Sequence, residues 1–386
     1  MKLKVWASYI FFIFTIIVVA TVLSEKTVVL TAENAGIRAF YKEQQQIDAV
    51  FIGPSSAYTV FLPPIAYNKY GITSAMYSIS GMVTEQYIYA AKEVMKYQTP
   101  KVLFIVADGI KPLQNRPPSK DNVVALRPIS IVKPSINKIK MIRALKKEMS
   151  FNNIEILEYY FPIIRFHSRW KNIQRNSYLS NSNPHKGAVI DFEEFYKRKY
   201  TYKDKQWEAS QIGGYKKQRN PNLYIKDLID FVRAERKKTK EELEILKYVN
   251  DIEDLFFYAS TLKNTKVIII ATPSLKYEEY FDRIQYIFHT AKKYGLDSFY
   301  MRDCEGLNID SNNDFLDEYH LNFFGAYKAT DYLSNLLVTE YGLKDKRNDS
   351  KYNSWDEEYI YYRYEIKRRY NIDVETGELI NSETNN

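Results

Sequence analysis

Apolar runs without a single polar interruption constrain the fold of this chain more than any other feature. They occur within PKVLFIVAD (100–108) and TKVIIIATP (265–273), and the first expected strand, over residues 47–52, is apolar except at Asp48. A run that is apolar at every position is typical of a parallel strand buried on both faces. Segments with apolar residues at helical spacing alternate with these runs; they cover residues 84–97, 241–262, 277–295 and 322–342. The alternation predicts an α/β fold, a three-layer α/β/α sandwich with a mostly parallel sheet.

The beginning of the chain indicates where the protein resides. The stretch Val5–Ser24 carries no charge and follows Lys2 and Lys4. A helix of that length, at ~1.5 Å per residue, spans about the ~30 Å of a bilayer core. A cleaved signal peptide is the alternative, but its apolar region is usually shorter, and no clear small-x-small cleavage site follows. Because the lysines precede the apolar stretch, we expect a single-pass membrane anchor with the C-terminal domain outside the cytoplasm.

Charge and cysteine content narrow the classes of partner. The net charge is +8, which suits anionic partners such as membrane surfaces or teichoic-acid-like polymers. The sequence contains no zinc-finger, helix-turn-helix or RNA-binding motif, so nucleic acid is not an expected partner. The single cysteine, Cys304, excludes an intrachain disulfide and a cysteine-based metal site.

The composition also divides the chain into regions. Residues from about 110 to 223 are rich in Lys, Arg, Asn, Tyr and Pro. We interpret them as an insertion over the strand ends, where open α/β sheets place their sites, although a plain surface embellishment is the simpler alternative. From residue 345 the sequence is charged and rich in tyrosine. The expected organisation is an anchor (1–26), an α/β domain with the insertion (27–344) and a charged C-terminal tail (345–386).

The first apolar run ends in a motif that could carry chemistry, Gly53-Pro54-Ser55-Ser56. Taken alone, such a motif is usually a turn. A serine at the carboxyl edge of a parallel sheet can also expose its Oγ and keep its N–H free to stabilise an oxyanion. Serine is a weak nucleophile, so a histidine must accept its proton, and an acid should orient that histidine. Ser55 is the expected nucleophile, with Ser56 as the alternative.

Among the four histidines, His320 has the most suggestive neighbours. It lies in DFLDEYHLN, just before the last expected helix, and Asp317 precedes it by three residues. That spacing allows the carboxylate and the imidazole to meet. His289 belongs to an amphipathic helix and is expected to be structural, and His185 to be a surface residue.

The remaining histidine lies in a basic, aromatic segment, PIIRFHSRW. Its charged residues, Arg165, His167 and Arg169, could bind an anionic polymer or a phosphate group. The simpler interpretation is an amphipathic strand with a cation–π contact at Trp170.

These motifs resemble a known family. FIGPSS after the first strand and DEYHLN near the end are similar to the SGNH/GDSL hydrolase superfamily, whose fold is flavodoxin-like. Gly53-Pro54-Ser55 corresponds to the Gly-Asp-Ser block of that family, and Asp317-x-x-His320 corresponds to its last block, Asp-x-x-His. With the anchor, PIIRFHSRW and DEYHLNFFGAYKAT, the chain looks like a bacterial cell-surface branch. That branch is similar to the D-alanine transfer protein of teichoic-acid systems and to polysaccharide O-acetyltransferases, which often work beside a multispanning membrane O-acyltransferase.

The resemblance implies a serine esterase or O-acyltransferase that needs no metal or cofactor. Ser55, Asp317 and His320 would form the triad, and the N–H groups of Ser55 and Gly81 would bind the oxyanion. Its substrate would be an acetyl or D-alanyl ester of a cell-envelope glycopolymer. The alternative is a non-catalytic scaffold of the same fold that binds a polymer or a membrane O-acyltransferase.

Two departures from the family pattern favour the scaffold. Pro54 replaces the usual Asp of the first block. The Gly-x-Asn-Asp block is missing, since VADGIK with Asp108 occupies its place, and so one side-chain oxyanion donor is unassigned. Asn115 and Arg165 are candidates for that donor.

Overall fold

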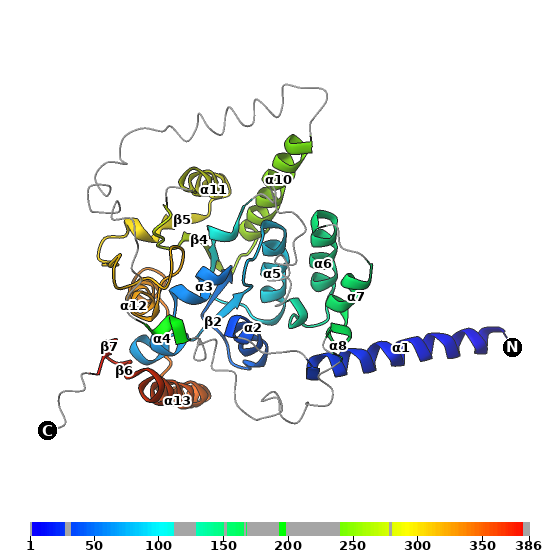
Figure 1. Cartoon of the computed structure of the whole chain (residues 1–386), viewed down its shortest axis with the longest axis horizontal. Coiled ribbons are helices and arrows are strands. Elements are labelled where there is room, and N and C mark those ends of the chain that lie inside the picture. Colours follow the sequence, from blue (N-terminus) through cyan, green and yellow to red (C-terminus); the bar gives the residue numbers. More distant parts are fainter. Residues whose placement is uncertain are drawn as a thin grey trace.

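The structure, a computed structural model, is built around a five-stranded sheet. It describes residues 2–27, 32–111, 129–149, 153–165, 167, 193–197, 240–277 and 280–380. The strands are β1 (Ala49–Gly53), β2 (Ser74–Ser78), β3 (Val102–Val106), β4 (Lys266–Ala271) and β5 (Asp297–Tyr300). Their order is β2-β1-β3-β4-β5, and each neighbouring pair is parallel (Figure 1). The expectation of an α/β fold with a mostly parallel sheet is therefore confirmed.

Both faces of this sheet are buried at its centre, which explains why β1 and β3 are apolar at every position and β4 is apolar after Lys266. Val50 and Ile52 of β1 belong to one hydrophobic cluster, whereas Ala49 and Phe51 belong to another. Successive side chains of a strand point to opposite faces, so the two clusters lie on opposite sides of the sheet. The Phe51 ring stacks on that of Phe104 in β3, with 4.5 Å between the ring centroids.

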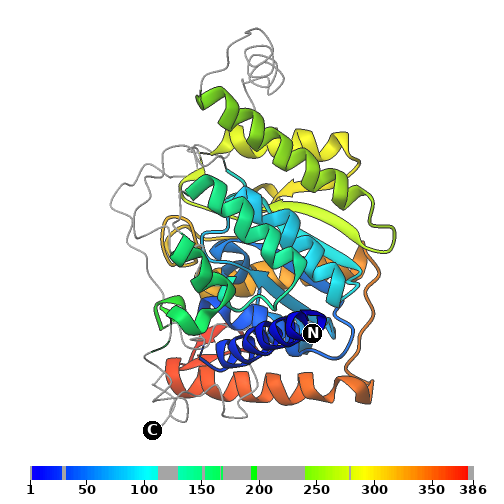
Figure 2. The ribbon, with the colours of Figure 1, turned by 90° about the vertical axis from the view of Figure 1, so that its right-hand side faces the viewer.

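Helices supply the apolar side chains that cover the sheet. They include α2 (Ala32–Lys42), α3 (Ser55–Val60), α4 (Pro63–Tyr70), α5 (Thr84–Tyr97), α6 (Ile136–Met149), α7 (Asn153–Tyr160), α10 (Lys240–Ser260), α11 (Phe281–Lys293) and α12 (Phe323–Thr339). Residues of α5, α6, α10 and α11 contribute to the first cluster, and residues of α3 and α12 to the second. Figure 2 shows α5 and α6 running alongside one another. The expected helices are thus present, although the one predicted over 277–295 begins only at Phe281.

The N-terminal helix α1 (Lys2–Thr27) stands apart from this core (Figure 1). Its segment Val5–Ser24 is long and apolar enough to cross a membrane. The short helix α8 (Pro162–Arg165) lies beside the end of α1, and the Ile163 N–H donates to Ser24 Oγ at 3.1 Å. The sequence-based expectation of an apolar helix long enough to be an anchor is therefore met.

The charged C-terminal segment is folded onto the domain. It forms helix α13 (Asn353–Tyr370) and a hairpin of β6 (Ile372–Asp373) and β7 (Glu378–Leu379). Trp355 and Tyr362 of α13 are fully buried, and Trp355 packs on the ring of Tyr67 in α4. The composition indicated only a tail because the exposed face of α13 carries most of the charges.

An ion pair links the C-terminal region to Asp48, the residue directly before β1. Lys346 Nζ lies 2.7 Å from Asp48 Oδ2 and also donates to Thr73 Oγ1 at 2.8 Å. The Asp48 side chain is 1% exposed. Without Lys346, Asp48 would keep two hydrogen bonds from Thr73 and Lys101 Nζ at 4.0 Å, so the cost is smaller than the about 3–5 kcal/mol of a wholly uncompensated buried charge.

We therefore expect Lys346→Met to lower the free energy of unfolding by about 1.5–3 kcal/mol in a denaturant titration, the range for one hydrogen bond to a charged group. Lys344→Met is the matched control, because Lys344 is exposed two residues away. Equal unfolding midpoints for the two variants would contradict the importance of this pair.

Candidate active site

The parallel sheet brings the ends of several strands to one edge. Carboxyl ends of parallel strands meet at the same edge of a sheet, where side chains from different loops can converge. Here the turns that follow β1, β2, β3 and β4 contain Ser55, Gly81, Asp108 and Thr272. Sequence-distant residues are thereby placed around one pocket.

The turn after β1 explains why that strand ends on a glycine. A Cβ atom added to Gly53 would lie 2.6 Å from Val106 Cβ at the end of β3. Only glycine permits this close approach of the two strand ends. Pro54 then caps α3, and Ser55 is the first residue of that helix. The motif is thus both a tight packing site and the start of a helix.

The structure brings the three predicted triad residues together. Ser55 Oγ lies 2.7 Å from His320 Nε2, although the two residues are 265 positions apart. His320 Nδ1 lies 2.8 Å from each carboxylate oxygen of Asp317. A carboxylate can only accept, so the proton resides on Nδ1 and leaves Nε2 to accept from the Ser55 hydroxyl. This is the arrangement in which a histidine can take the proton of a serine.

Asp317 is held as a carboxylate by its surroundings. Partial burial opposes ionisation, but the hydrogen bond from His320 and those from the backbone outweigh it, so the pKa of Asp317 lies below its usual value. The N–H groups of Tyr319 and His320 donate to Asp317 Oδ1 at 2.8 and 2.9 Å. An ionised Asp317 fixes the tautomer of His320.

Hydrogen bonds hold the loop that carries Asp317 and His320 in place. The Leu316 N–H donates to the His320 carbonyl at 2.9 Å. Asn322, which is fully buried, caps α12 by accepting from the Phe324 and Gly325 N–H groups at 3.0 and 3.1 Å. Sequence reasoning did not single out Asn322, although an asparagine just before an apolar helical pattern is a recognisable cap. Its side chain sets where α12 begins and so where His320 stands.

Ser55 and His320 open onto a pocket of ≈ 380 Å³. Its other lining residues are Pro54, Ser56, Gly81, Met82, Asp108, Gly109, Lys111, Tyr280, Arg283 and Tyr319. Gly81 has φ +67, a left-handed conformation that favours glycine. Within the part of the chain that the structure describes, the N–H groups of Ser55 and Gly81 donate no hydrogen bond. Both are therefore available to a negatively charged oxygen in the pocket.

Asp108 is the acidic residue of this pocket. Its Oδ2 accepts three hydrogen bonds: from Ser56 Oγ at 3.1 Å, from Thr272 Oγ1 at 3.0 Å and from the Thr272 N–H at 3.3 Å. Its Oδ1 is buried and has no partner among the described residues. Burial raises the pKa of Asp108, and the hydrogen bonds at Oδ2 only partly offset this. Sequence reasoning noticed Asp108 but gave it no role.

Two of the three basic residues predicted to bind substrate, Arg165 and His167, do not line this pocket. Arg165 lies in α8 and donates to the Tyr159 hydroxyl at 3.4 Å. His167 is exposed, with Nδ1 2.7 Å from the Ile164 carbonyl oxygen. Both are therefore placed beside the end of α1 rather than at Ser55.

Two further predicted residues cannot be placed, and two residues of the pocket were not predicted. Arg169 and Asn115 lie outside the described residues. The cationic side chains that do line the pocket of Ser55 are Lys111 and Arg283, which no sequence motif marked. Their role depends on loops that meet only in the folded chain.

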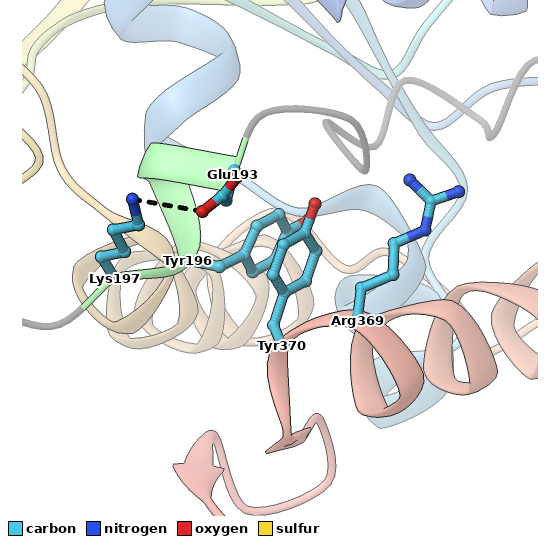
Figure 3. A pocket seen from close by; sticks show the side chains of 5 residues that line it. All are labelled: Glu193, Tyr196, Lys197, Arg369 and Tyr370. Atoms are coloured by element: carbon cyan, nitrogen blue, oxygen red, sulfur yellow. Dashed lines mark ion pairs between the residues drawn. The ribbon is translucent and has the colours of Figure 1, made fainter.

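A second and larger pocket, of ≈ 500 Å³, lies between the short helix η4 (Glu193–Tyr196) and the end of α13 (Figure 3). The rings of Tyr196 and Tyr370 stack there with centroids 4.1 Å apart, and Lys197 pairs with Glu193 at 3.2 Å. The described residues that line it, Glu193, Tyr196, Lys197, Arg369 and Tyr370, include no nucleophile paired with a histidine. The smaller pocket is therefore the candidate active site.

Comparisons with known proteins add no assignment: no protein-family model matches the chain, and no curated protein or solved structure is significantly similar to it. Proposals about function consequently depend on the site itself.

Proposed function

We propose that this protein is a membrane-anchored serine esterase or O-acyltransferase with an SGNH-like three-layer α/β/α fold. The observation that carries the proposal is the continuous hydrogen-bonded chain from Ser55 through His320 to Asp317. A core cluster on each face of a parallel sheet supports the three-layer arrangement. A non-catalytic scaffold would not require a serine, a histidine and a carboxylate to be aligned at the mouth of a pocket.

In this mechanism Ser55 Oγ attacks the carbonyl carbon of an acyl ester while His320 Nε2 accepts the hydroxyl proton. The carbonyl oxygen becomes an oxyanion, which the N–H groups of Ser55 and Gly81 stabilise. Collapse of this intermediate breaks the ester bond, and His320 returns the proton to the leaving alcohol. Water or an acceptor hydroxyl then gives its proton to His320 and attacks the acyl-serine, which frees Ser55.

The proposed setting is the outer face of the membrane. Helix α1 and the lysines before its apolar segment support an outward-facing domain. The net charge of +8 and the cationic Lys111 and Arg283 in the pocket suit an anionic envelope polymer. We propose acetyl or D-alanyl esters of a cell-envelope glycopolymer as substrates, with a multispanning membrane O-acyltransferase as a partner.

One labelling experiment tests both the chemistry and the orientation. A membrane-impermeant fluorophosphonate, which reacts with activated serines, is applied to intact cells and to lysates that contain the full chain. We expect wild type to be labelled in both samples and Ser55→Ala in neither. Labelling only after lysis would place the domain inside the cell. Absence of labelling in both samples would contradict the serine mechanism and leave the scaffold as the better account.

A further inference from the structure

Asp108 has two carboxyl oxygens in very different surroundings. Its Oδ2 accepts three hydrogen bonds, whereas its Oδ1 is buried and accepts none from the described residues. A buried charge without a partner is costly, and a carboxyl group avoids that cost by taking up a proton. Since Oδ2 is already saturated with donors, the proton belongs on Oδ1. A protonated Oδ1 is a hydrogen-bond donor with no acceptor in the described protein.

The position of this donor is set by the turn after β3. A Cβ atom added to Gly109 would lie 2.6 Å from the Met82 carbonyl oxygen and 3.2 Å from Pro54 Cγ. The turn therefore lies tightly between the turn that carries Gly81 and the turn that carries Ser55. Asp108, directly before Gly109, lines the same pocket as Ser55 and Gly81, whose N–H groups would bind the oxyanion.

The groups around Asp108 do not supply a strong counter-charge to Oδ1. Arg283 donates through Nη2 to the Asp108 backbone carbonyl at 3.3 Å, and its charge lowers the pKa of Asp108 by less than burial raises it. The pKa values of the neighbouring hydroxyls of Tyr87, Tyr280 and Tyr300 are raised by burial, so these groups remain neutral. The other titratable groups that line the pocket are Lys111, Tyr319 and His320.

We propose that Asp108 is a catalytic residue that donates a hydrogen bond from a protonated Oδ1 to the oxyanion. The ester carbonyl oxygen gains negative charge as Ser55 attacks, and the Oδ1–H stabilises it together with the N–H groups of Ser55 and Gly81. The proton stays on Asp108 throughout. This inference depends on the proposed serine mechanism and fills the side-chain donor position that the sequence left unassigned.

Two substitutions at this position separate a donor from a merely structural acid. In Asp108→Asn, the amide carbonyl can accept the three bonds now made to Oδ2, and the amide N–H can donate into the pocket. We expect kcat for hydrolysis of a small acetyl ester by the full chain in detergent to fall less in this variant than in Asp108→Ala. Asp108→Ala loses the donor, and we expect its kcat to fall by about 10²–10³.

The dependence of kcat on pH gives the sharper test. A carboxyl group with a raised pKa donates only below that pKa, so wild-type kcat should fall as the pH rises through the pKa of Asp108. Asp108→Asn should lack this fall. Thr272→Val removes one hydrogen bond that favours the ionised form, so the fall should move to higher pH. A purely structural acid would produce neither change.

The outcomes are distinguishable from failure of the serine mechanism. Fluorophosphonate labelling of Ser55 and hydrolysis by wild type establish that mechanism independently of Asp108. Given those, an alkaline fall that persists in Asp108→Asn, or that is unmoved in Thr272→Val, overturns the role of Asp108. Wild-type kcat in Asp108→Ala would do the same. If Asp108→Ala does not fold, the pH profiles of the other two variants still decide the question.

Discussion

We expect Ser55→Ala and His320→Ala each to lower kcat for ester hydrolysis by about 10⁶-fold. Ser55 supplies the attacking oxygen, and His320 is the group that can accept its proton, at 2.7 Å. Neither function is replaced by a neighbour, because Ser56 is hydrogen-bonded to Asp108 instead. Turnover of a small acetyl ester by purified full chain, with protein concentration set by absorbance, provides the measurement.

The double variant should be no slower than either single variant, because the two residues act as one unit. Ser260→Ala and His289→Ala are matched controls, since Ser260 is exposed at the end of α10 and His289 lies in α11 away from the pocket. Hydrolysis by Ser55→Ala within tenfold of wild type would rule out Ser55 as the nucleophile.

The second large effect is expected from Asp317→Asn, which should lower kcat by about 10⁴. The new amide oxygen can still accept from the backbone N–H groups of Tyr319 and His320, so the loop should keep its shape. The new amide nitrogen, however, faces His320 Nδ1 as a donor. The imidazole then favours the tautomer protonated on Nε2, which cannot accept from Ser55.

Glu318→Gln is a suitable control for Asp317→Asn, because Glu318 is the adjacent carboxylate and does not line the pocket. Rate constants and melting temperatures of both variants are compared with wild type. An Asp317→Asn enzyme with nearly wild-type kcat would mean that Asp317 does not orient His320.

Much of the fold could be predicted because the sheet is buried on both faces. This burial makes β1, β3 and most of β4 continuously apolar, and such runs are visible without any structure. The ends of the strands were predicted less accurately: β1 is observed over Ala49–Gly53 instead of residues 47–52. Helix α13 was not anticipated, since the burial of Trp355 and Tyr362 depends on partners far away in the sequence.

Some residues of the candidate site could likewise be predicted from the sequence, and others could not. Ser55 and the pair of Asp317 and His320 were predictable because each lies in a short motif with a chemical rationale. Asp108 and Arg283 could not be assigned to the pocket, since their placement depends on where three turns and the start of α11 converge. The predicted Arg165 failed to reach the pocket because α8 packs near α1.

The short connection between α1 and α2 limits where the pocket can work. Helix α1 ends at Thr27 and α2 begins at Ala32, and the five Cα–Cα steps between these two residues span at most roughly 18 Å even when fully extended. Helix α2 packs directly against β2, which lies next to the strand that leads to Ser55. With α1 in the bilayer, as we propose, the short connection keeps Ser55 close to the membrane surface. Encounters then depend on the two-dimensional density of acyl esters at the membrane surface and little on their concentration in the surrounding medium.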